Sequence, residues 1–244
     1  MATIDHVGVQ TSNLDASLRL FSRGFELLGF QGGRVDSGGF HEWDNFAIAR
    51  ATGDRPVTRN LHVAFVASSR AQVDRWWGGL TAAGHRDDGA PGPRPEYSPS
   101  YYGAFIRDHD GNSIEAVSYD TSDGAAGVID HLWVRVRDIG ATRGFYAPVA
   151  ESLGLAVRDR RDRITLVTES GTVTFVEGAP TENLHLAFGV GGEEPVRAFH
   201  HAGLRAGGLD NGAPGERPEY HPGYFGAFVH DPDANNVEAV FHDR

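Results

Sequence analysis

The sequence predicts an α+β protein of two tandem domains, each built from two βαβββ modules. Three observations predict this fold. The chain repeats itself, and strand-like and helix-like segments follow one another in the same order four times. The composition, with 40% hydrophobic and 23% charged residues in 244, is that of an ordinary globular protein with a buried core.

The repeat is most evident near the end of each half. Residues 89–117, GAPGPRPEYSPSYYGAFIRDHDGNSIEAV, closely match residues 212–240, GAPGERPEYHPGYFGAFVHDPDANNVEAV, and 212 minus 89 gives an offset of 123. Upstream, Ile-Asp-His occurs at both 4–6 and 129–131. We therefore expect a first domain over residues 1–120, a polar linker of small residues over 121–127, and a second domain over 128–244.

In the first module, alternation in residues 4–10 predicts a strand. Ser12 and Asn13 offer an N-cap for a helix that ends near Gly29. Residues 46–49 add a short strand. The helix carries an apolar stripe of Leu14, Leu18, Phe21, Phe25 and Leu28.

The second module repeats this order. Residues 61–66 predict a strand, and Ser69 caps a helix that Gly84 closes. A turn-rich segment then leads to strands at 102–106 and 113–118, joined by a turn at 108–112. The second half follows the same plan, with helices near 139–153 and 194–206.

Two histidines and one glutamate recur in both halves within predicted strands. Alternation predicts that His6 shares a face with Ile4 and Gly8. Imidazoles and a carboxylate inside strands are costly to bury unless they are paired or bind a metal, and two histidines with one carboxylate form many catalytic metal sites. The alternative is that they are ordinary strand side chains preserved by a recent duplication. The six residues are His6, His62, Glu115, His131, His185 and Glu238.

Four βαβββ modules, the paired strand histidines and the endings DHDGNSIE (108–115) and DPDANNVE (231–238) resemble the vicinal oxygen chelate superfamily. This superfamily includes glyoxalase I, extradiol dioxygenases and bleomycin-resistance proteins. The resemblance implies curved, mostly antiparallel sheets around a divalent ion: Fe(II), Zn, Mn or Ni. By position, the ligands would be His6, His62 and Glu115 in one cup, and His131, His185 and Glu238 in the other. If modules exchange, His6 would instead face His185 and Glu238, and a homodimer formed by exchange is a further alternative.

Two departures from the family pattern bear on the reaction. Glyoxalase I usually adds an acidic fourth ligand late in its first module, where residues 46–50 offer none and Glu177 lies in an uncertain register. Extradiol enzymes commonly have a tyrosine ten residues before the ligand glutamate, where this chain has Phe105 and Phe228. A three-ligand site is therefore expected, and the reaction stays open.

Further polar residues lie in the loop before the last two strands of each half. His221, Tyr220 and Tyr224 are candidate acid, base or orienting groups, which makes the second domain the favoured active copy. Arg94, Arg217 and Tyr97 are candidates for binding the substrate, the arginines through an anionic group. The alternatives are local pairing of the arginines with Glu96 and Glu219, packing tyrosines, and a solvated His221. These candidates belong to the segments 94–101 and 217–224.

The function expected is that of a metal-dependent dioxygenase, isomerase or lyase acting on a small oxygenated molecule. The alternative is a bleomycin-resistance-like protein that sequesters a small molecule without chemistry. The net charge of −11 argues against nucleic acid and anionic membranes as partners. The absence of cysteine excludes thiolate sites, and no apolar run is long enough to span a bilayer. No signal peptide is visible, so we expect a cytoplasmic protein.

Overall fold

The computed structural model describes residues 2–30, 32–35, 39–119 and 127–243. The predicted order of elements is present in four modules. The first has β1 (Thr3–Thr11), α1 (Leu14–Leu27), β2 (Arg34–Val35), β3 (His41–Trp43) and β4 (Phe46–Arg50); the second has β5 (His62–Val66), α2 (Arg70–Ala82), β6 (Arg86–Pro93), β7 (Tyr102–Arg107) and β8 (Ser113–Ser118). The third has β9 (Ile129–Val136), α3 (Ile139–Ser152), β10 (Ala156–Arg160), β11 (Arg163–Val167) and β12 (Thr172–Glu177); the fourth has β13 (His185–Gly189), α4 (Glu193–Arg205), β14 (Leu209–Glu216), β15 (Tyr224–His230) and β16 (Asn236–His242).

Each of the two sheets takes one module from each half of the chain. The sheet that we call the terminal sheet joins the first module to the fourth, in the order β14-β15-β16-β13-β1-β4-β3-β2. The central sheet joins the second to the third, in the order β10-β11-β12-β9-β5-β8-β7-β6. Of the two arrangements that the sequence allowed, the structure therefore has the exchanged one. The repeats over 1–120 and 128–244 do not coincide with the sheets, and residues 121–126 of the expected linker lie outside the described residues.

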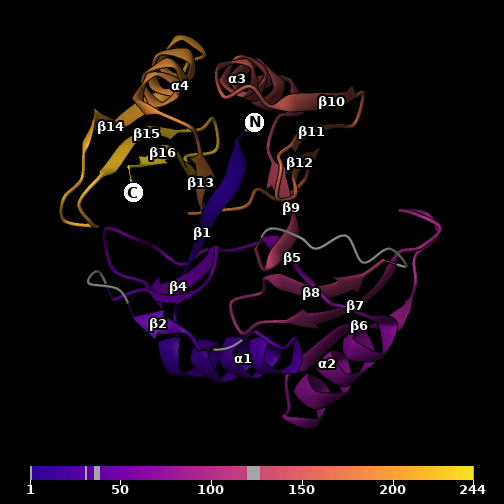
Figure 1. Cartoon of the computed structure of the whole chain (residues 1–244). Helices are drawn as coiled ribbons and strands as arrows, with labels where there is room; N and C mark the ends of the chain where they lie inside the picture. The colour runs from indigo at the N-terminus through magenta and orange to yellow at the C-terminus, as the bar shows by residue number, and fades with distance from the viewer. Residues whose placement is uncertain (1, 31, 36–38, 120–126, 244) are drawn as a thin grey trace.

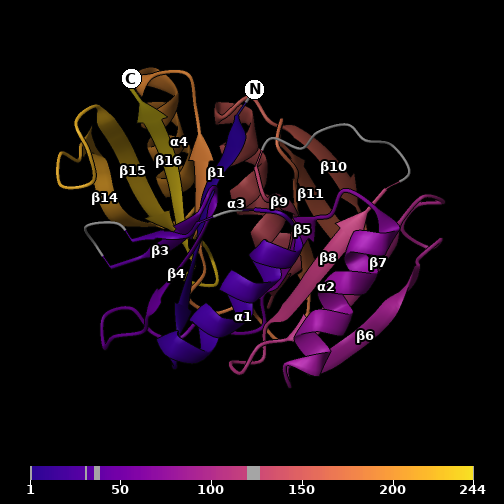
Figure 2. The ribbon, with the colours of Figure 1, turned by 60° about the horizontal axis from the view of Figure 1, so that its bottom comes forward.

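The seam in each sheet is an antiparallel pair of first strands, β1 with β13 and β5 with β9. The helices pair within each half, unlike the strands of the seams. α1 contacts α2, and α3 contacts α4 at the opposite end of the molecule (Figure 1). Figure 2 shows α2 lying along β7 and β8. Sheets thus link the halves, whereas helices link the two modules of one half.

One continuous apolar core lies between the helices and the sheets. It draws Phe25 and Phe65 from the first half and Phe145 and Phe199 from the second, all almost fully buried. Because successive strand residues point to opposite faces, these side chains leave the other face of each sheet free for polar groups. We call that second face the site face.

A β-bulge at Asp5 changes which side chains of β1 share a face. Ile4 pairs with Phe188 and His6 pairs with Ala187, so Asp5 is an extra residue between them. Ile4 consequently lies in the apolar core, and the prediction that it shares a face with His6 is wrong. The central sheet has the same irregularity at Asp130. The bulges bring each aspartate beside the histidine that follows it.

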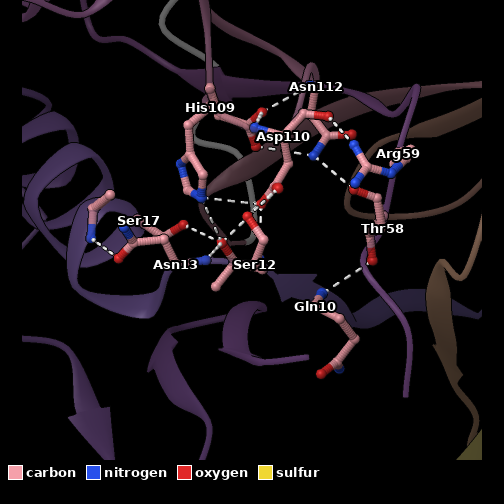
Figure 3. A network of polar contacts seen from close by, with 12 residues as sticks. Gln10, Ser12, Asn13, Ser17, Thr58, Arg59, His109, Asp110 and Asn112 are labelled. Carbon is pink, nitrogen blue, oxygen red and sulfur yellow. Dashed lines mark hydrogen bonds and ion pairs between the residues drawn. The ribbon is translucent and has the colours of Figure 1, made fainter. Parts of the chain in front are cut away.

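The turn at residues 108–112 joins the two modules of the first half (Figure 3). Asp110 accepts hydrogen bonds from the backbone N–H and the hydroxyl of Ser12, directly before α1. Asn112 accepts one from the backbone N–H of Leu61, directly before β5. In the second half, Asn235 accepts the equivalent bond from Leu184. Asp110, Asn112 and Asn235 of the repeated endings therefore have structural roles.

The segment 89–93, predicted as turn-rich, is part of strand β6, and its counterpart belongs to β14. Both are edge strands with irregular register. Glycine and proline are tolerated there because one side of an edge strand makes no ladder hydrogen bonds. At a bulge, the extra residue is likewise left out of the ladder. The predicted N-caps, in contrast, are confirmed at Asn13 and Ser69.

Candidate metal centres

His6, His185 and Glu238 meet on the site face of the terminal sheet, from β1, β13 and β16. Nε2 of His6 lies 2.9 Å from Nε2 of His185 and 3.6 Å from Oε2 of Glu238. Nε2 of His185 lies 3.1 Å from the same carboxylate oxygen. Two ligands that are each about 2.1 Å from an ion lie about 3 Å apart at right angles, so the three atoms fit one divalent ion. We call this group the terminal site.

His62, His131 and Glu115 form the equivalent central site, from β5, β9 and β8. Nε2 of His62 lies 3.0 Å from Oε2 of Glu115, and Nε2 of His131 lies 3.6 Å from the same oxygen. In each site all the candidate ligand atoms lie within 4.8 Å of one another. The grouping of His6 with His62 and Glu115, which the positional carry-over predicted, is not formed because the modules exchange.

An aspartate orients one histidine of each site. Nδ1 of His6 donates to Oδ1 of Asp5 over 2.7 Å, and Nδ1 of His131 donates to Asp130 over the same distance. This bond places the ring proton on Nδ1 and leaves the Nε2 lone pair toward the other two ligands, as in metal-bound histidines generally. The bulges make these bonds between sequence neighbours.

A tyrosine hydroxyl binds the second oxygen of each glutamate. Tyr224 donates to Oε1 of Glu238 over 2.5 Å, and Tyr101 donates to Oε1 of Glu115 over 2.6 Å. Glycine makes room for both carboxylates, because a Cβ at Gly226 would lie 2.9 Å from Oε1 of Glu238. These bonds leave Oε2 of each glutamate for the histidines.

Burial controls the charge of both sites. It raises the pKa of Glu238 to about 7, although the charge of His6 and the Tyr224 hydrogen bond oppose the rise. It raises the pKa of Glu115 to about 7 as well. Burial also lowers the pKa of His62 and of His185 to about 4. These two imidazoles are therefore neutral at ordinary pH, which is the form that binds a metal.

The two sites differ in the second residue that donates a hydrogen bond to the aspartate. At the terminal site, Nε2 of His242 donates to Oδ2 of Asp5 over 3.0 Å, and His242 in turn lies 2.9 Å from Nε2 of His221. Burial alone would raise the pKa of Asp5, but the hydrogen bonds from His242 and His6 hold it well below its usual value. At the central site, the hydroxyl of Tyr119 takes the place of His242 and donates to Asp130 over 3.1 Å.

The three candidate catalytic residues all lie near the terminal site, at different depths. Tyr224 is buried and touches Glu238 directly. Tyr220 is 52% exposed, and its ring packs on that of Tyr224 at 4.9 Å. His221 bonds to His242 and to the carbonyl of Pro222, so it reaches His6 only through His242 and Asp5.

Arg94 and Arg217 have matching surroundings in the two halves. Nη2 of each donates to a backbone carbonyl, that of Ala90 or that of Ala213. The guanidinium of Arg94 lies 5.6 Å from the ring centre of Phe105 on β7. That of Arg217 lies 5.6 Å from the ring centre of Phe228 on β15. Their contacts are therefore with carbonyls and rings, in place of the Glu96 and Glu219 pairing that the sequence also allowed.

Neither an acidic fourth ligand nor the extradiol tyrosine lies on the site face at the positions expected for them. On β4, Ala47 pairs with Gly8 and shares its face. On β12, Glu177 pairs with Val136, which lies in the apolar core, so this glutamate is not on the site face. Phe105 lies beside His62 at 5.9 Å between ring centres and carries no hydroxyl. Among the residues that the structure describes, each site therefore offers three protein ligands.

Sequence reasoning missed several residues that support the ligands. Asp5 and Asp130 had a visible signal, because Ile-Asp-His occurs twice. Tyr101 had one too, because it is the counterpart of Tyr224 across the repeat. His242 had none, because its counterpart is Tyr119. Asn236, whose side-chain amide lies 2.8 Å from Nδ1 of His185, likewise differs from its counterpart, Ser113.

Residues 3–116 match the family model of the Glyoxalase/Bleomycin resistance protein/Dioxygenase superfamily. The match confirms the resemblance found in the sequence. No curated protein matches the chain by sequence. None of the helices within the described residues is long and apolar enough to cross a membrane.

Solved structures share the fold over the whole chain. A mutant of glyoxalase I from Zea mays matches with a TM-score of 0.71 and 20% identity, over 99% of this chain and 94% of that one. Another structure of the Zea mays glyoxalase I matches with a TM-score of 0.68 and 18% identity, over 99% and 93%. At these identities the likeness shows the fold, and it confirms the tandem α+β architecture of βαβββ modules.

Proposed function

We propose that this protein is a divalent-metal-dependent enzyme that acts on a small oxygenated molecule. The observation that carries the proposal is the convergence of two imidazoles and one carboxylate at each of two sites, with supporting hydrogen bonds on the ligands. The match to the superfamily model supports it. A divalent ion held there would polarise a carbonyl or, as Fe(II), supply the redox chemistry of an oxygenase. The proposal covers Fe(II), Zn, Mn or Ni as the ion, and a dioxygenase, an isomerase or a lyase as the reaction class.

The chain's own groups would perform three tasks at the terminal site. His6, His185 and Glu238 would hold the ion, and Asp5 would keep the His6 ring in the required tautomer. Tyr224 would hold the Glu238 carboxylate through Oε1. With three protein ligands, two neutral and one anionic, positions remain for vicinal oxygens of a substrate.

The terminal site is the favoured catalytic site, because its surroundings add a pair of titratable imidazoles that the central site lacks. His221 and His242 could accept or return a proton through the hydrogen-bonded series His221–His242–Asp5. Tyr220, half exposed beside Tyr224, would contact the substrate at the edge of the site. Tyr224 itself would orient Glu238.

The candidate substrate contacts are Arg94 and Tyr97 near the central site and Arg217 near the terminal site. Arg94 is close enough to Glu115 for its charge to act on the pKa of that carboxyl. Each arginine could bind an anionic group of a substrate through donors that the backbone carbonyls leave unused. A small molecule is therefore the proposed partner, and a cytoplasmic location is part of the same proposal.

The alternative is a protein that binds a small molecule without chemistry. The supporting bonds from Asp5, Asp130, Tyr101 and Tyr224 favour a metal centre, since a purely apolar or cationic ligand has no need of oriented imidazoles. Sequestration would still fit the acidic net charge if the ligand were a cationic drug.

The test has two steps and uses untagged full-length protein. The metal content is measured after loading with each candidate ion, and we expect two ions per chain in the wild type and one in Glu238→Gln or in Glu115→Gln. Oxygen uptake with catechol and deuterium exchange of dihydroxyacetone then distinguish the two reaction classes. Protein that binds no ion, and holds a cationic drug equally well with chelator present, would favour sequestration and contradict the proposal.

A further inference from the structure

Gly8 and Trp133 occupy the same register position in the two sheets. Gly8 pairs with the ligand His185 across the β1–β13 seam. Trp133 pairs with the ligand His62 across the β5–β9 seam. Each is two residues after a candidate ligand histidine on its own strand, so each lies on the site face. The terminal site therefore has no side chain where the central site has an indole.

A series of ring contacts connects Trp133 to the surroundings of Glu115. The Trp133 ring is 6.3 Å from that of Tyr97, and the Tyr97 ring is 5.1 Å from that of Tyr101. Tyr101 in turn donates its hydroxyl to Glu115. Trp133 and Tyr97 thus form a continuous aromatic edge next to the candidate ligands.

The strand next to Gly8 also carries smaller side chains than the strand next to Trp133. Ala47 of β4 pairs with Gly8, whereas Thr174 of β12 pairs with Trp133. One step further along the same face, Ala49 of β4 corresponds to Val176 of β12. All three positions carry the smaller side chain in the terminal site.

The exposure of the ligands agrees with this difference. The side chains of His6 and His185 are 28% and 20% exposed at the terminal site. Those of His62 and His131 are 13% and 10% exposed at the central site. The central histidines are therefore more covered, although the distances from the histidines to the glutamate are nearly the same in the two triads.

We propose that Trp133 is a specificity-determining residue that restricts the central site to ligands with a small substituent beyond the chelating oxygens. The terminal site, with Gly8 at the same position, accepts a bulky substituent such as an aromatic ring. This inference rests on the proposed metal centres. It assigns the two sites different substrate classes: compact oxygen chelators at the central site, and larger ones at the terminal site.

Two variants isolate the sites for the test. Glu115→Gln leaves the terminal site to bind metal, and Glu238→Gln leaves the central site. Both proteins are loaded with Co(II), whose visible spectrum reports each binding event. The probes are acetohydroxamic acid and benzohydroxamic acid, two bidentate oxygen chelators that differ by a methyl or a phenyl group.

We expect Glu115→Gln protein to bind the two probes with dissociation constants within about threefold of each other, and Glu238→Gln protein to bind the benzo probe at least about tenfold more weakly. Adding Trp133→Gly to Glu238→Gln should bring the two constants to within about threefold, whereas Trp133→Phe should keep most of the difference. Tyr97→Ala, at a position 56% exposed and therefore tolerant of substitution, should reduce the difference in part.

Equal binding of the two probes by Glu238→Gln protein would overturn the inference and leave the metal centres standing. So would an unchanged ratio in both the Trp133→Gly and the Tyr97→Ala proteins. Failure of both single-site proteins to take up Co(II), with folding verified by circular dichroism, would overturn the metal centres and this inference with them.

Discussion

The hydroxyl of Tyr224 donates to Oε1 of Glu238 over 2.5 Å and thereby fixes a carboxylate that is almost wholly buried. Tyr224→Phe removes this bond, and the pKa of Glu238 should rise further because the bond favours the ionised form. We expect the affinity of the terminal site for a divalent ion to fall about tenfold at pH 7. Metal titration in the Glu115→Gln background measures the effect.

The matched control is Tyr220→Phe, which removes a hydroxyl from a neighbouring ring that packs on Tyr224 in a T-shaped arrangement. Its metal affinity should equal that of the parent. A Tyr224→Phe protein that binds metal as tightly as the parent would show that the hydrogen bond does not prepare the ligand.

Metal binding should release protons in a pH-dependent way. The pKa of Glu238 and of Glu115 is raised to about 7 without metal, so both are mostly protonated at pH 6 and mostly ionised at pH 8. His62 and His185, with pKa values lowered to about 4, are neutral throughout this range and do not compete. Each site should therefore release more protons on binding metal at pH 6 than at pH 8.

Calorimetry in buffers with different ionisation enthalpies measures this proton release directly. The apparent affinity for metal should fall about tenfold per pH unit below pH 7. Proton release that is the same at pH 6 and pH 8 would mean that the carboxylates are already ionised in the metal-free protein.

His242 should support the terminal site through Asp5. His242→Ala leaves Oδ2 of Asp5 without its donor, and we expect the metal affinity of that site to fall about tenfold. His242→Tyr copies the central site, where Tyr119 donates to Asp130, and should keep the affinity within about threefold. If both variants bind metal like the parent, Asp5 does not need the second donor.

His221→Ala tests a catalytic role apart from metal binding. His221 contacts His242 and the Pro222 carbonyl, so its removal should leave the metal content unchanged. If the imidazole moves a proton during turnover, kcat should fall about 100-fold. Unchanged kcat in fully loaded protein would remove His221 from the mechanism.

The exchange of modules predicts the behaviour of an isolated half. Residues 1–120 contain β1 and β5 but neither of their partners, β13 and β9, so each first strand would expose an unpaired edge. We expect this fragment to dimerise, with the first module of one copy beside the second module of the other. Light scattering after gel filtration measures the mass, and a monomer that binds metal would contradict the pairing described above.

The ligand types and the modules could be predicted because both are local and both are repeated. The partners of His6 could not, since His62 with Glu115 and His185 with Glu238 are chemically equivalent choices. Only the pairing of β1 with β13 decides between them, and a pairing of β1 with its own half would satisfy the same alternation. Long-range strand pairing leaves no distinctive mark on sequences that are near copies of each other.

The bulge at Asp5 was hidden for a related reason. The alternation argument assumes an unbroken pleat, and one extra residue moves every preceding side chain to the other face. Ile4 is apolar and so fits the core side, which in retrospect is a sign of the shift. Strand β6 was missed because its glycines and prolines resemble a turn, although an edge position tolerates them.

Each of the two centres needs ligands from both halves of the chain. The terminal centre takes His6 from the first copy and its other ligands from the second, while the central centre takes only His131 from the second. Losing either copy would dismantle both. A substitution at a position such as Trp133, whose counterpart is Gly8, can nevertheless change the selectivity of one centre. It does so without disturbing the strand pairing on which both centres depend.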